Sequence, residues 1–423
     1  MPIHLNNKQA GACLAALLAL PAWAHQDGDA AIPDTEGAQV RLAAALVSRS
    51  ASGRLPSQGL PGYLLRGDPG VDPRGGALEH AVVQGGYRWN PRLGAELSLG
   101  AHGSDPAHVE AAWVQGRGSH GDTDWTLGAG RRGPSLGAVL AQAGHLDRFG
   151  LMPLAKQAVL DGDWIEDGAE LGLARQAEAS GWRLDAGVWR GRAFTGTPGG
   201  PAFPSVHAAF NRRTDAGDVA ADAFVAALRP DGRGSRLANA PGGHTHTAPV
   251  CDASLREVVC FSGRSRVAGL SAEWASRDWP LLLGGAQMWR QEDGSLQSRN
   301  GLGGYAGRTR GGWQQAVWRI APGWELAARR ESLSAQQSLA GPGASLVATE
   351  AGLGGYAPQR RFAALLGHAA SPWADLRVEW GRERAGAQAA RFVALRLVLH
   401  WDRSIAPATD AAPAAPADGT PPP

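Results

Sequence analysis

The sequence predicts an all-β protein, a transmembrane antiparallel up-and-down β-barrel of about 16 strands. Segments of about ten residues alternate strictly between apolar and polar side chains, as in barrels whose strands face lipid on one side and a lumen on the other. The connections between these segments alternate between very short and long, which matches short periplasmic turns and long external loops. Beyond the N-terminal segment no run of about 18 apolar residues occurs, so helical membrane spans are excluded.

Residues 1–24 have the organisation of a secretory signal peptide. Lys8 precedes an apolar run over 10–20, and Ala22 and Ala24 supply the small residues of a cleavage site. The run is too short to cross a bilayer as a helix, which needs roughly 20 residues. A lipoprotein signal at Cys13 is the alternative, but Cys13 lies inside the apolar run. We therefore expect export, followed by a short periplasmic segment over 25–38.

The alternation is clearest in three segments. Trp182, Leu184 and Val188 share one face of a strand whose other face carries Arg183 and Asp185. Residues 375–382 repeat the pattern. The segment 391–401 places apolar side chains on one face and ends on an aromatic residue, as terminal barrel strands do. We therefore expect the barrel to span 39–402 and a disordered Pro/Ala-rich tail to occupy 403–423.

The number of strands provides a check, because bacterial single-chain barrels have an even number. Demoting the Gly-rich segment 346–356 to a loop leaves sixteen candidates, and fourteen is possible because 234–239 is weak. The long segments 50–77, 133–167, 193–216, 240–263 and 291–310 are then all external. The seventeen candidate strands are 39–49, 78–89, 93–101, 108–117, 124–132, 168–177, 182–192, 217–228, 234–239, 264–276, 280–290, 311–320, 323–333, 346–356, 360–369, 374–384 and 390–401.

Charged residues recur on the polar face of many strands, which argues against a soluble sandwich with a dry core. In a barrel the same residues line a water-filled lumen. Opposed charges there set a transverse field and tune ion selectivity, or they only solvate the wall and pair with each other. The segment 133–167 narrows the pore if it folds inward. The predicted pore-lining residues are Arg183, Arg319, Arg329, Arg377, Arg396, Glu96, Glu325 and Glu379.

Cysteine and histidine residues concentrate in 242–260. In an exported chain that has lost its signal peptide, Cys251 and Cys260 remain as an even pair and are expected to form one disulfide. His244 and His246 place two imidazoles on one side of an extended chain, which is half of a zinc site. The alternative is that these are two histidines in a polar loop that bind no metal, and the prediction requires no cofactor.

The segment 143–174 carries a further pattern. His145, Phe149, Pro153, Leu154, Ala158, Leu160, Gly162, Asp167, Gly168 and Leu171 resemble, in type and spacing, a group of proteobacterial porin-like outer-membrane proteins of about this length, some labelled zinc-regulated outer-membrane receptors. The resemblance implies a barrel and a metal role for His145. Gly144 and Leu151 replace residues that the family usually has as histidine and aspartate. A 22-stranded transporter around a plug would need a longer chain than 423 residues.

The sequence therefore predicts a porin-like channel in the outer membrane of a Gram-negative bacterium, for passive passage of small hydrophilic solutes or ions. The alternative is a surface protein without a channel, whose His-containing external loops bind zinc or a partner. We expect no enzyme, because neighbouring Ser and His residues do not define a triad. The formal net charge of +2 gives no reason to expect nucleic acid. Outer-membrane lipid surrounds such a barrel, and a homotrimer is possible.

Overall fold

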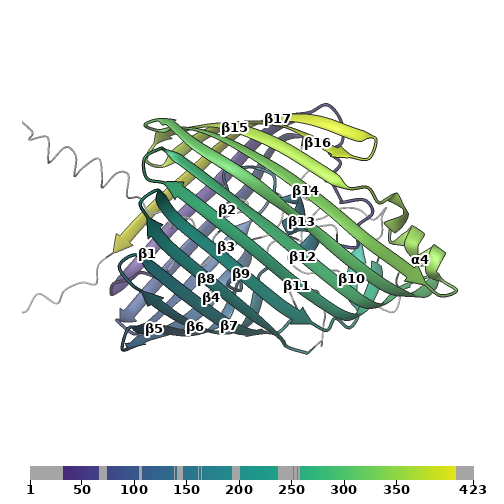
Figure 1. Cartoon of the computed structure of the whole chain (residues 1–423), viewed down its shortest axis with the longest axis horizontal. Helices are drawn as coiled ribbons and strands as arrows, with labels where there is room; N and C mark the ends of the chain where they lie inside the picture. The colour runs from purple at the N-terminus through teal and green to yellow at the C-terminus, as the bar shows by residue number, and fades with distance from the viewer. Residues whose placement is uncertain are drawn as a thin grey trace, which may run out of the picture.

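The computed structural model describes residues 32–65, 74–103, 107–137, 139–140, 146–160, 162, 164–192, 201–236, 251, 255 and 258–405. Within them the strands form one antiparallel sheet that closes on itself, because the last strand pairs with the first. The strands are tilted relative to the barrel's long direction (Figure 1). Among the described residues, no helix is long and apolar enough to cross a membrane.

Each strand pairs with its neighbour in sequence, apart from the short β10. The strands of the first half are β1 (Gly37–Ala51), β2 (Gly75–Asn90), β3 (Leu93–Ala101), β4 (His108–His120), β5 (Thr123–Arg132), β6 (Glu166–Gln176), β7 (Ser180–Trp189), β8 (Phe203–Thr214), β9 (Gly217–Leu228) and β10 (Arg233–Arg236). Those of the second half are β11 (Val258–Ser276), β12 (Leu281–Ser298), β13 (Gly301–Ala321), β14 (Trp324–Ala340), β15 (Gln359–Ser371), β16 (Ala374–Ala385) and β17 (Gln388–Ile405).

The barrel has sixteen strand positions although seventeen strands are labelled. β9 pairs with β11 over Ser265–Ser276, and β10 pairs with the preceding part of the same strand, Val258–Phe261. β9 and β10 therefore lie one after the other along the same edge of β11 and together count as one strand of the barrel. The predicted antiparallel barrel of sixteen strands is confirmed. Its observed bounds are Gly37 and Ile405, so the last strand runs three residues past the predicted end at 402.

The outward face of the barrel is apolar. Leu97, Leu127, Val188, Val225 and Val393 are exposed although the strands that carry them are paired on both sides. Exposed aromatic side chains gather near the short turns, as in the interfacial girdles of membrane barrels; they include Tyr87, Trp89, Trp182, Phe210, Trp279, Trp318, Trp324, Trp373 and Trp401. A closed barrel with this surface is an outer-membrane protein, and the predicted location is confirmed.

The predicted number of strands is correct because one strand was missed and one weak candidate was counted in excess. The segment 193–216 was expected to be an external loop, but β8 occupies Phe203–Thr214. The weak candidate 234–239 was counted as one of the sixteen strands, but β10 covers only Arg233–Arg236 beside β11. Demoting 346–356 was correct, because this segment forms α4 (Ala344–Glu350) and the 3-10 helix η1 (Leu353–Gly355).

The prediction that 291–310 is an external loop was also wrong. β12 and β13 continue through this segment as one long hairpin, paired from Leu281↔Trp318 to Ser298↔Gly301. The hairpin extends beyond the lipid-facing band, so its residues there are Gly-rich and polar and lack an apolar face. The alternation that predicts a strand is therefore absent from this part of the sequence. The wall over β11 to β14 is therefore much taller than the wall over β3 to β8.

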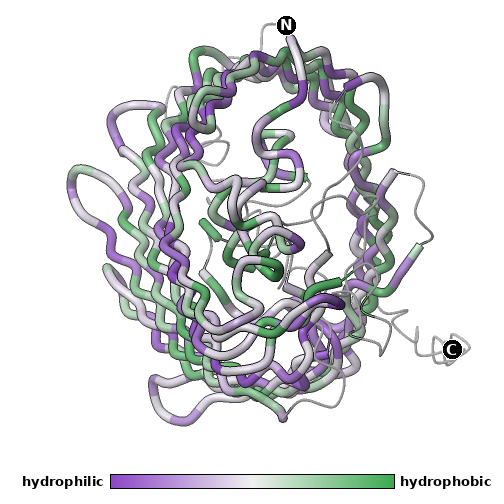
Figure 2. Tube along the Cα trace, turned by 90° about the vertical axis from the view of Figure 1, so that its right-hand side faces the viewer, coloured by the Kyte–Doolittle hydropathy of each residue, from purple (hydrophilic) through white to green (hydrophobic). Residues whose placement is uncertain are grey.

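Described stretches of chain also cross the interior of the barrel. Figure 2, which looks into the barrel, shows chain inside the ring of strands. The principal one is residues 146–160, here called the inner segment, which ends in α3 (Leu154–Leu160). α3 contacts β12, β13 and β14, so the inner segment lies against the tall wall.

Candidate functional site: the barrel interior

The inner segment is seated by apolar contacts. Phe149 is buried in a cluster with Val317, Leu365 and Phe392 from the wall. Leu154 and Ala158 pack with Leu333 on β14, and Val159 and Leu160 belong to a third cluster with Met288 and Trp313. Several residues that carry the family resemblance, Phe149, Leu154, Ala158 and Leu160, are therefore the ones that bind this segment to the wall.

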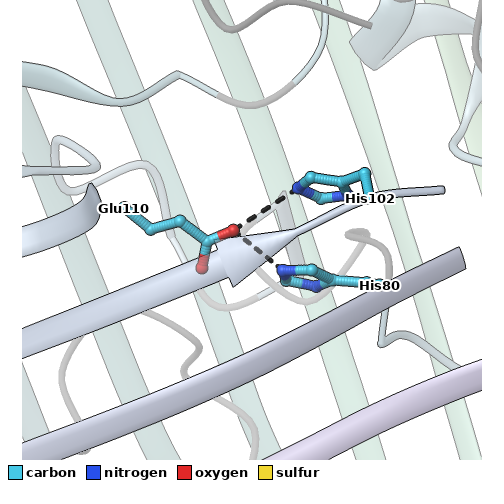
Figure 3. A group of neighbouring side chains, drawn as sticks. All are labelled: His80, His102 and Glu110. Carbon is cyan, nitrogen blue, oxygen red and sulfur yellow. Dashed lines mark hydrogen bonds and ion pairs between the residues drawn. The ribbon is translucent and has the colours of Figure 1, made fainter. Parts of the chain in front are cut away.

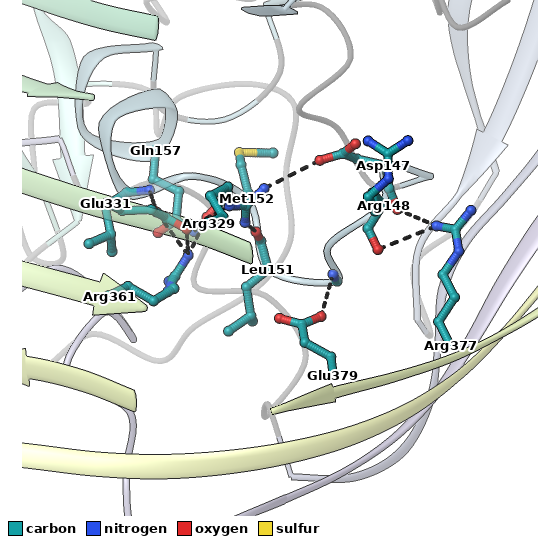
Figure 4. Close-up of polar contacts among 12 residues, drawn as sticks. Asp147, Arg148, Leu151, Met152, Gln157, Arg329, Glu331, Arg361, Arg377 and Glu379 are labelled. Atoms are coloured by element: carbon teal, nitrogen blue, oxygen red, sulfur yellow. Dashed lines mark hydrogen bonds and ion pairs between the residues drawn. The ribbon is translucent and has the colours of Figure 1, made fainter. Parts of the chain in front are cut away.

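Glu331 on β14 is the most densely bonded of the buried carboxylates under the segment. It accepts from Arg329 Nε at 2.9 Å and from Arg361 Nη1 at 3.3 Å. The backbone N–H of Leu154, at the start of α3, donates to its other oxygen at 2.7 Å. Arg329, Glu331 and Arg361 are all fully shielded from solvent. Figure 4 shows these groups gathered where the segment meets the wall. Buried charges persist only when paired in this way.

A second set of contacts holds the start of the segment. Arg377 and Arg396 donate to the carbonyl oxygen of Asp147 at 2.8 and 2.9 Å. The backbone N–H of Gly150 donates to Glu379 at 2.8 Å (Figure 4). A side chain at Gly150 would place its Cβ 2.8 Å from Arg396, so only glycine allows this approach. The predicted residues Arg329, Arg377, Arg396 and Glu379 thus hold the inner segment.

Other predicted residues stay closer to water. Glu325 pairs with Arg148 of the inner segment at 2.9 Å, and both side chains are 23% exposed. Arg183 pairs with Asp185 at 2.8 Å and keeps 33% of its side-chain surface exposed. Arg319 is exposed near the short turn between β13 and β14. Glu96 is buried on the inner face of β3.

Residues 52–65, after β1, also pack inward. Ser57 donates through its backbone N–H and its hydroxyl to Glu383, both at 2.9 Å. The Tyr63 hydroxyl donates to the carbonyl oxygen of Leu333 at 3.2 Å. Burial, reinforced by the neighbouring Tyr356, raises the pKa of Tyr63 above its ordinary value. Residues 52–65 and the inner segment therefore both occupy part of the barrel interior.

The opposite wall carries its own polar group. His207 on β8 lies between two carboxylates, with Nδ1 2.9 Å from Asp185 and Nε2 3.1 Å from Asp222. Arg132 pairs with the buried Glu170 on the neighbouring strand. Sequence reasoning missed His207 in this role because β8 had been assigned to a loop.

A compact group of three histidines and one glutamate lies on the inner face at the loop end of β2, β3 and β4. Nε2 of His80 lies 2.8 Å from Glu110 Oε1, and Nε2 of His102 lies 3.5 Å from the same oxygen (Figure 3). Nε2 of His108 is 3.7 Å from it. Ligand atoms of His80, His102 and Glu110 all lie within 4.8 Å of one another, which suits a metal ion. Imidazole and carboxylate together are a zinc-type donor set.

The structure joins Cys251 to Cys260 in a disulfide, as the sequence predicts. Cys260 is the first residue of β11 that pairs with β12. A Cβ placed on Gly232, which follows β9, would lie 3.5 Å from Cys251. The predicted metal residues His145, His244 and His246 lie outside the described residues, as do residues 1–31 with the predicted signal peptide and 406–423 of the predicted tail.

No protein-family model matches the chain, and no curated protein matches it. Solved structures do match. An OmpT variant that lacks loop L8, from Vibrio cholerae, is 12% identical, with 86% of this chain and 100% of that chain covered and a TM-score of 0.52. Outer-membrane expressed OmpT of Vibrio cholerae is 10% identical, with 88% and 100% covered and a TM-score of 0.50. OprB of Pseudomonas putida is 9% identical, with 86% and 94% covered and a TM-score of 0.50. At these identities the likeness establishes the fold.

Proposed function

We propose that the protein is an outer-membrane channel through which small hydrophilic solutes or ions pass down their gradients, without chemistry. The observation that carries this proposal is the inner face of the barrel. Polar side chains in its short-turn half keep partial exposure to water, although every strand is paired on both sides. A sixteen-stranded barrel of this kind encloses an aqueous channel. These partly exposed inner residues are Gln84, Gln115, Arg183, Asn211, Gln315, Glu325 and Arg377.

The inner segment sets the width of the proposed channel. It is bonded to β14 through an ion pair and to β15, β16 and β17 through hydrogen bonds that involve its backbone, so it lies against this part of the wall. Arg148 and Glu325 stay partly accessible beside it, and Arg183 stays partly accessible on the opposite wall. They place opposite charges next to the solute path, where they act on ion selectivity.

Planar-bilayer recording of the purified protein tests the proposal. We expect discrete conductance steps, and swelling of proteoliposomes in small sugars. Absence of both from a folded protein would contradict a channel. Silence together with zinc-dependent ordering of the loops would instead support a surface protein that binds metal.

A charge variant tests the assigned path. In Arg148→Gln the accessible positive charge beside Glu325 is lost, so the reversal potential in a salt gradient shifts toward cation preference. Arg213→Gln is the matched control, because Arg213 is exposed at the end of β8, beside the short turn to β9, and its loss is expected to leave selectivity unchanged. Equal selectivity in the wild type and in Arg148→Gln would remove the inner segment from the solute path.

A further inference from the structure

Two β-bulges lie side by side at the loop end of β2, β3 and β4. The pairing of β1 with β2 shifts between Ala45 and Leu46, which leaves Glu79 as an extra residue. The pairing of β3 with β4 shifts between Ser98 and Leu99, which leaves Glu110 as an extra residue. A bulge redirects side chains that would otherwise alternate. Glu79 and His80 are consecutive, yet Glu79 reaches Arg396 and His80 reaches Glu110, so both contact residues of the interior.

Three imidazole nitrogens converge on one oxygen of Glu110. A carboxylate oxygen has room for about two hydrogen bonds, whereas three imidazole Nε2 atoms lie 2.8, 3.5 and 3.7 Å from Glu110 Oε1. The imidazoles are stacked, with ring centroids of His80 and His102 4.2 Å apart and those of His102 and His108 5.2 Å apart. The three imidazole rings are thus stacked with their Nε2 atoms close to the same oxygen, Glu110 Oε1.

His102 gives the clearest indication of a cation. Its Nδ1 lies 3.3 Å from the carbonyl oxygen of Glu79, an acceptor, so Nδ1 carries the proton. In a neutral imidazole Nε2 is then an acceptor as well. This lone pair faces an anionic oxygen at 3.5 Å, and the repulsion is relieved by a second proton on the ring or by a metal cation between the two atoms. A backbone carbonyl on the other ring nitrogen is also the usual support of a metal-binding histidine.

We propose that His80, His102 and Glu110, joined by His108, bind one zinc ion in the inner wall of the barrel. Three neutral imidazoles and one carboxylate match the four-coordinate site that zinc prefers, whereas magnesium and calcium prefer oxygen ligands. His80 and His102 are buried, so the ligands are held in place by their surroundings. The ion ties β2 and β4 to His102, which directly follows β3. The proposal does not depend on the passage of solutes.

Gly100 leaves the space that the carboxylate of Glu110 occupies. A Cβ at Gly100 would lie 2.0 Å from Glu110 Oε1, so the carboxylate occupies its place only because this residue has no side chain. Gly85 on β2 has no atom within 4 Å of a built Cβ and serves as its matched control.

Titration calorimetry with zinc on the detergent-solubilised full chain tests the proposal. The wild type is expected to bind about one zinc per chain, and cobalt to give the visible absorption of a tetrahedral site. His102→Ala and Glu110→Gln are expected to weaken binding at least about tenfold, equivalent to about 1.4 kcal/mol. His120→Ala, an exposed histidine at the other end of β4, keeps the wild-type affinity.

Gly100→Ala separates ligand geometry from ligand loss. It keeps all four ligands but displaces Glu110, so zinc affinity and the cobalt spectrum change while Gly85→Ala leaves both unaltered. Circular dichroism melting confirms that each variant is folded. A folded wild type that binds no zinc overturns the site. Wild-type affinity in His102→Ala and Glu110→Gln overturns it too, as does loss of all binding in His244→Ala/His246→Ala.

Discussion

Glu331 is the residue on which most of the interior contacts depend. Its two oxygens neutralise Arg329 and Arg361 and also receive the N–H of Leu154. All of these groups are out of contact with water, so no solvent replaces a missing partner. Removing one member of a buried ion pair is far more damaging than losing an exposed pair.

Glu331→Ala is expected to destabilise the barrel by about 3–5 kcal/mol, because two buried guanidinium groups lose a shared carboxylate and keep only Asp147 for Arg329 and Glu383 for Arg361. It also releases the start of α3, so single-channel conductance is expected to rise. Urea unfolding followed by tryptophan fluorescence, with bilayer recording, measures both effects. Glu325→Ala breaks a partly exposed pair and is expected to cost only about 0–1 kcal/mol. Equal losses in the two variants would refute the role of burial.

For single residues, the sequence predicted which side of the barrel wall a side chain faces better than it predicted which residues that side chain contacts. Alternation placed Arg329, Arg377 and Arg396 on the inner face, where the structure has them. It did not predict that the inner segment covers them, since that depends on contacts between residues far apart in the chain. The bulges at Glu79 and Glu110 change which side chains point inward, and no local pattern marks them.

Among the elements, the inner segment depends most on close approach. Gly150→Val is expected to lift the segment from the wall, because its Cβ would meet Arg396 and Glu79. The cost of such overpacking is about 1–3 kcal/mol, and we expect larger and noisier conductance steps. Gly53→Val is the control, as nothing lies within 4 Å of a built Cβ there. Unchanged recordings in Gly150→Val would mean that the segment does not limit conductance.

β8 provides a test of the strand that sequence reasoning missed. Val206 is exposed on its outward face, so Val206→Arg places a charge in lipid and is expected to cost about 2–4 kcal/mol near the bilayer centre. Asn211→Arg on the inner face, near the short turn, is the control with little expected cost. Folding yield into lipid vesicles and urea titration compare the two. A mild effect of Val206→Arg would argue for a loop at 193–216.

The missed strand has a physical explanation. Pro204 lies at the start of β8, and proline within a run argues against a strand unless a backbone donor is dispensable there. Apolar Phe203 on the inner face also interrupts the alternation, since it packs on Trp164 rather than facing the lumen. Segments with clean alternation, such as 182–189 and 375–382, were placed correctly because one face meets lipid and the other water.

For the whole molecule, the disulfide links the loop after β10 to the tall wall. Cys251→Ser/Cys260→Ser is expected to reduce stability by about 2–3 kcal/mol, because the closed loop is short and mainly restricts the unfolded chain. Heat-modifiability on gels, with and without reductant, measures this shift. The reduced wild type should match the double variant, and a variant as stable as the oxidised wild type would show that the bond has no stabilising effect.

The tall wall has a consequence for where the membrane ends. On β13, Trp318 is exposed near the short turns, whereas Arg308 and Arg310 are exposed on the same outward face. The ten residue steps from Trp318 to Arg308 span about 33 Å along the strand, which at a tilt of about 40° is about 25 Å of height, the height of the apolar band of such barrels, and Arg310 lies just inside this limit. The hydrocarbon therefore stops near Arg310, and the hairpin tip at Ser298 and Gly301 stands well above it. In the described residues the strands are long over β11 to β14 and short over β3 to β8, so we expect solutes to reach the proposed channel mainly over the lower side.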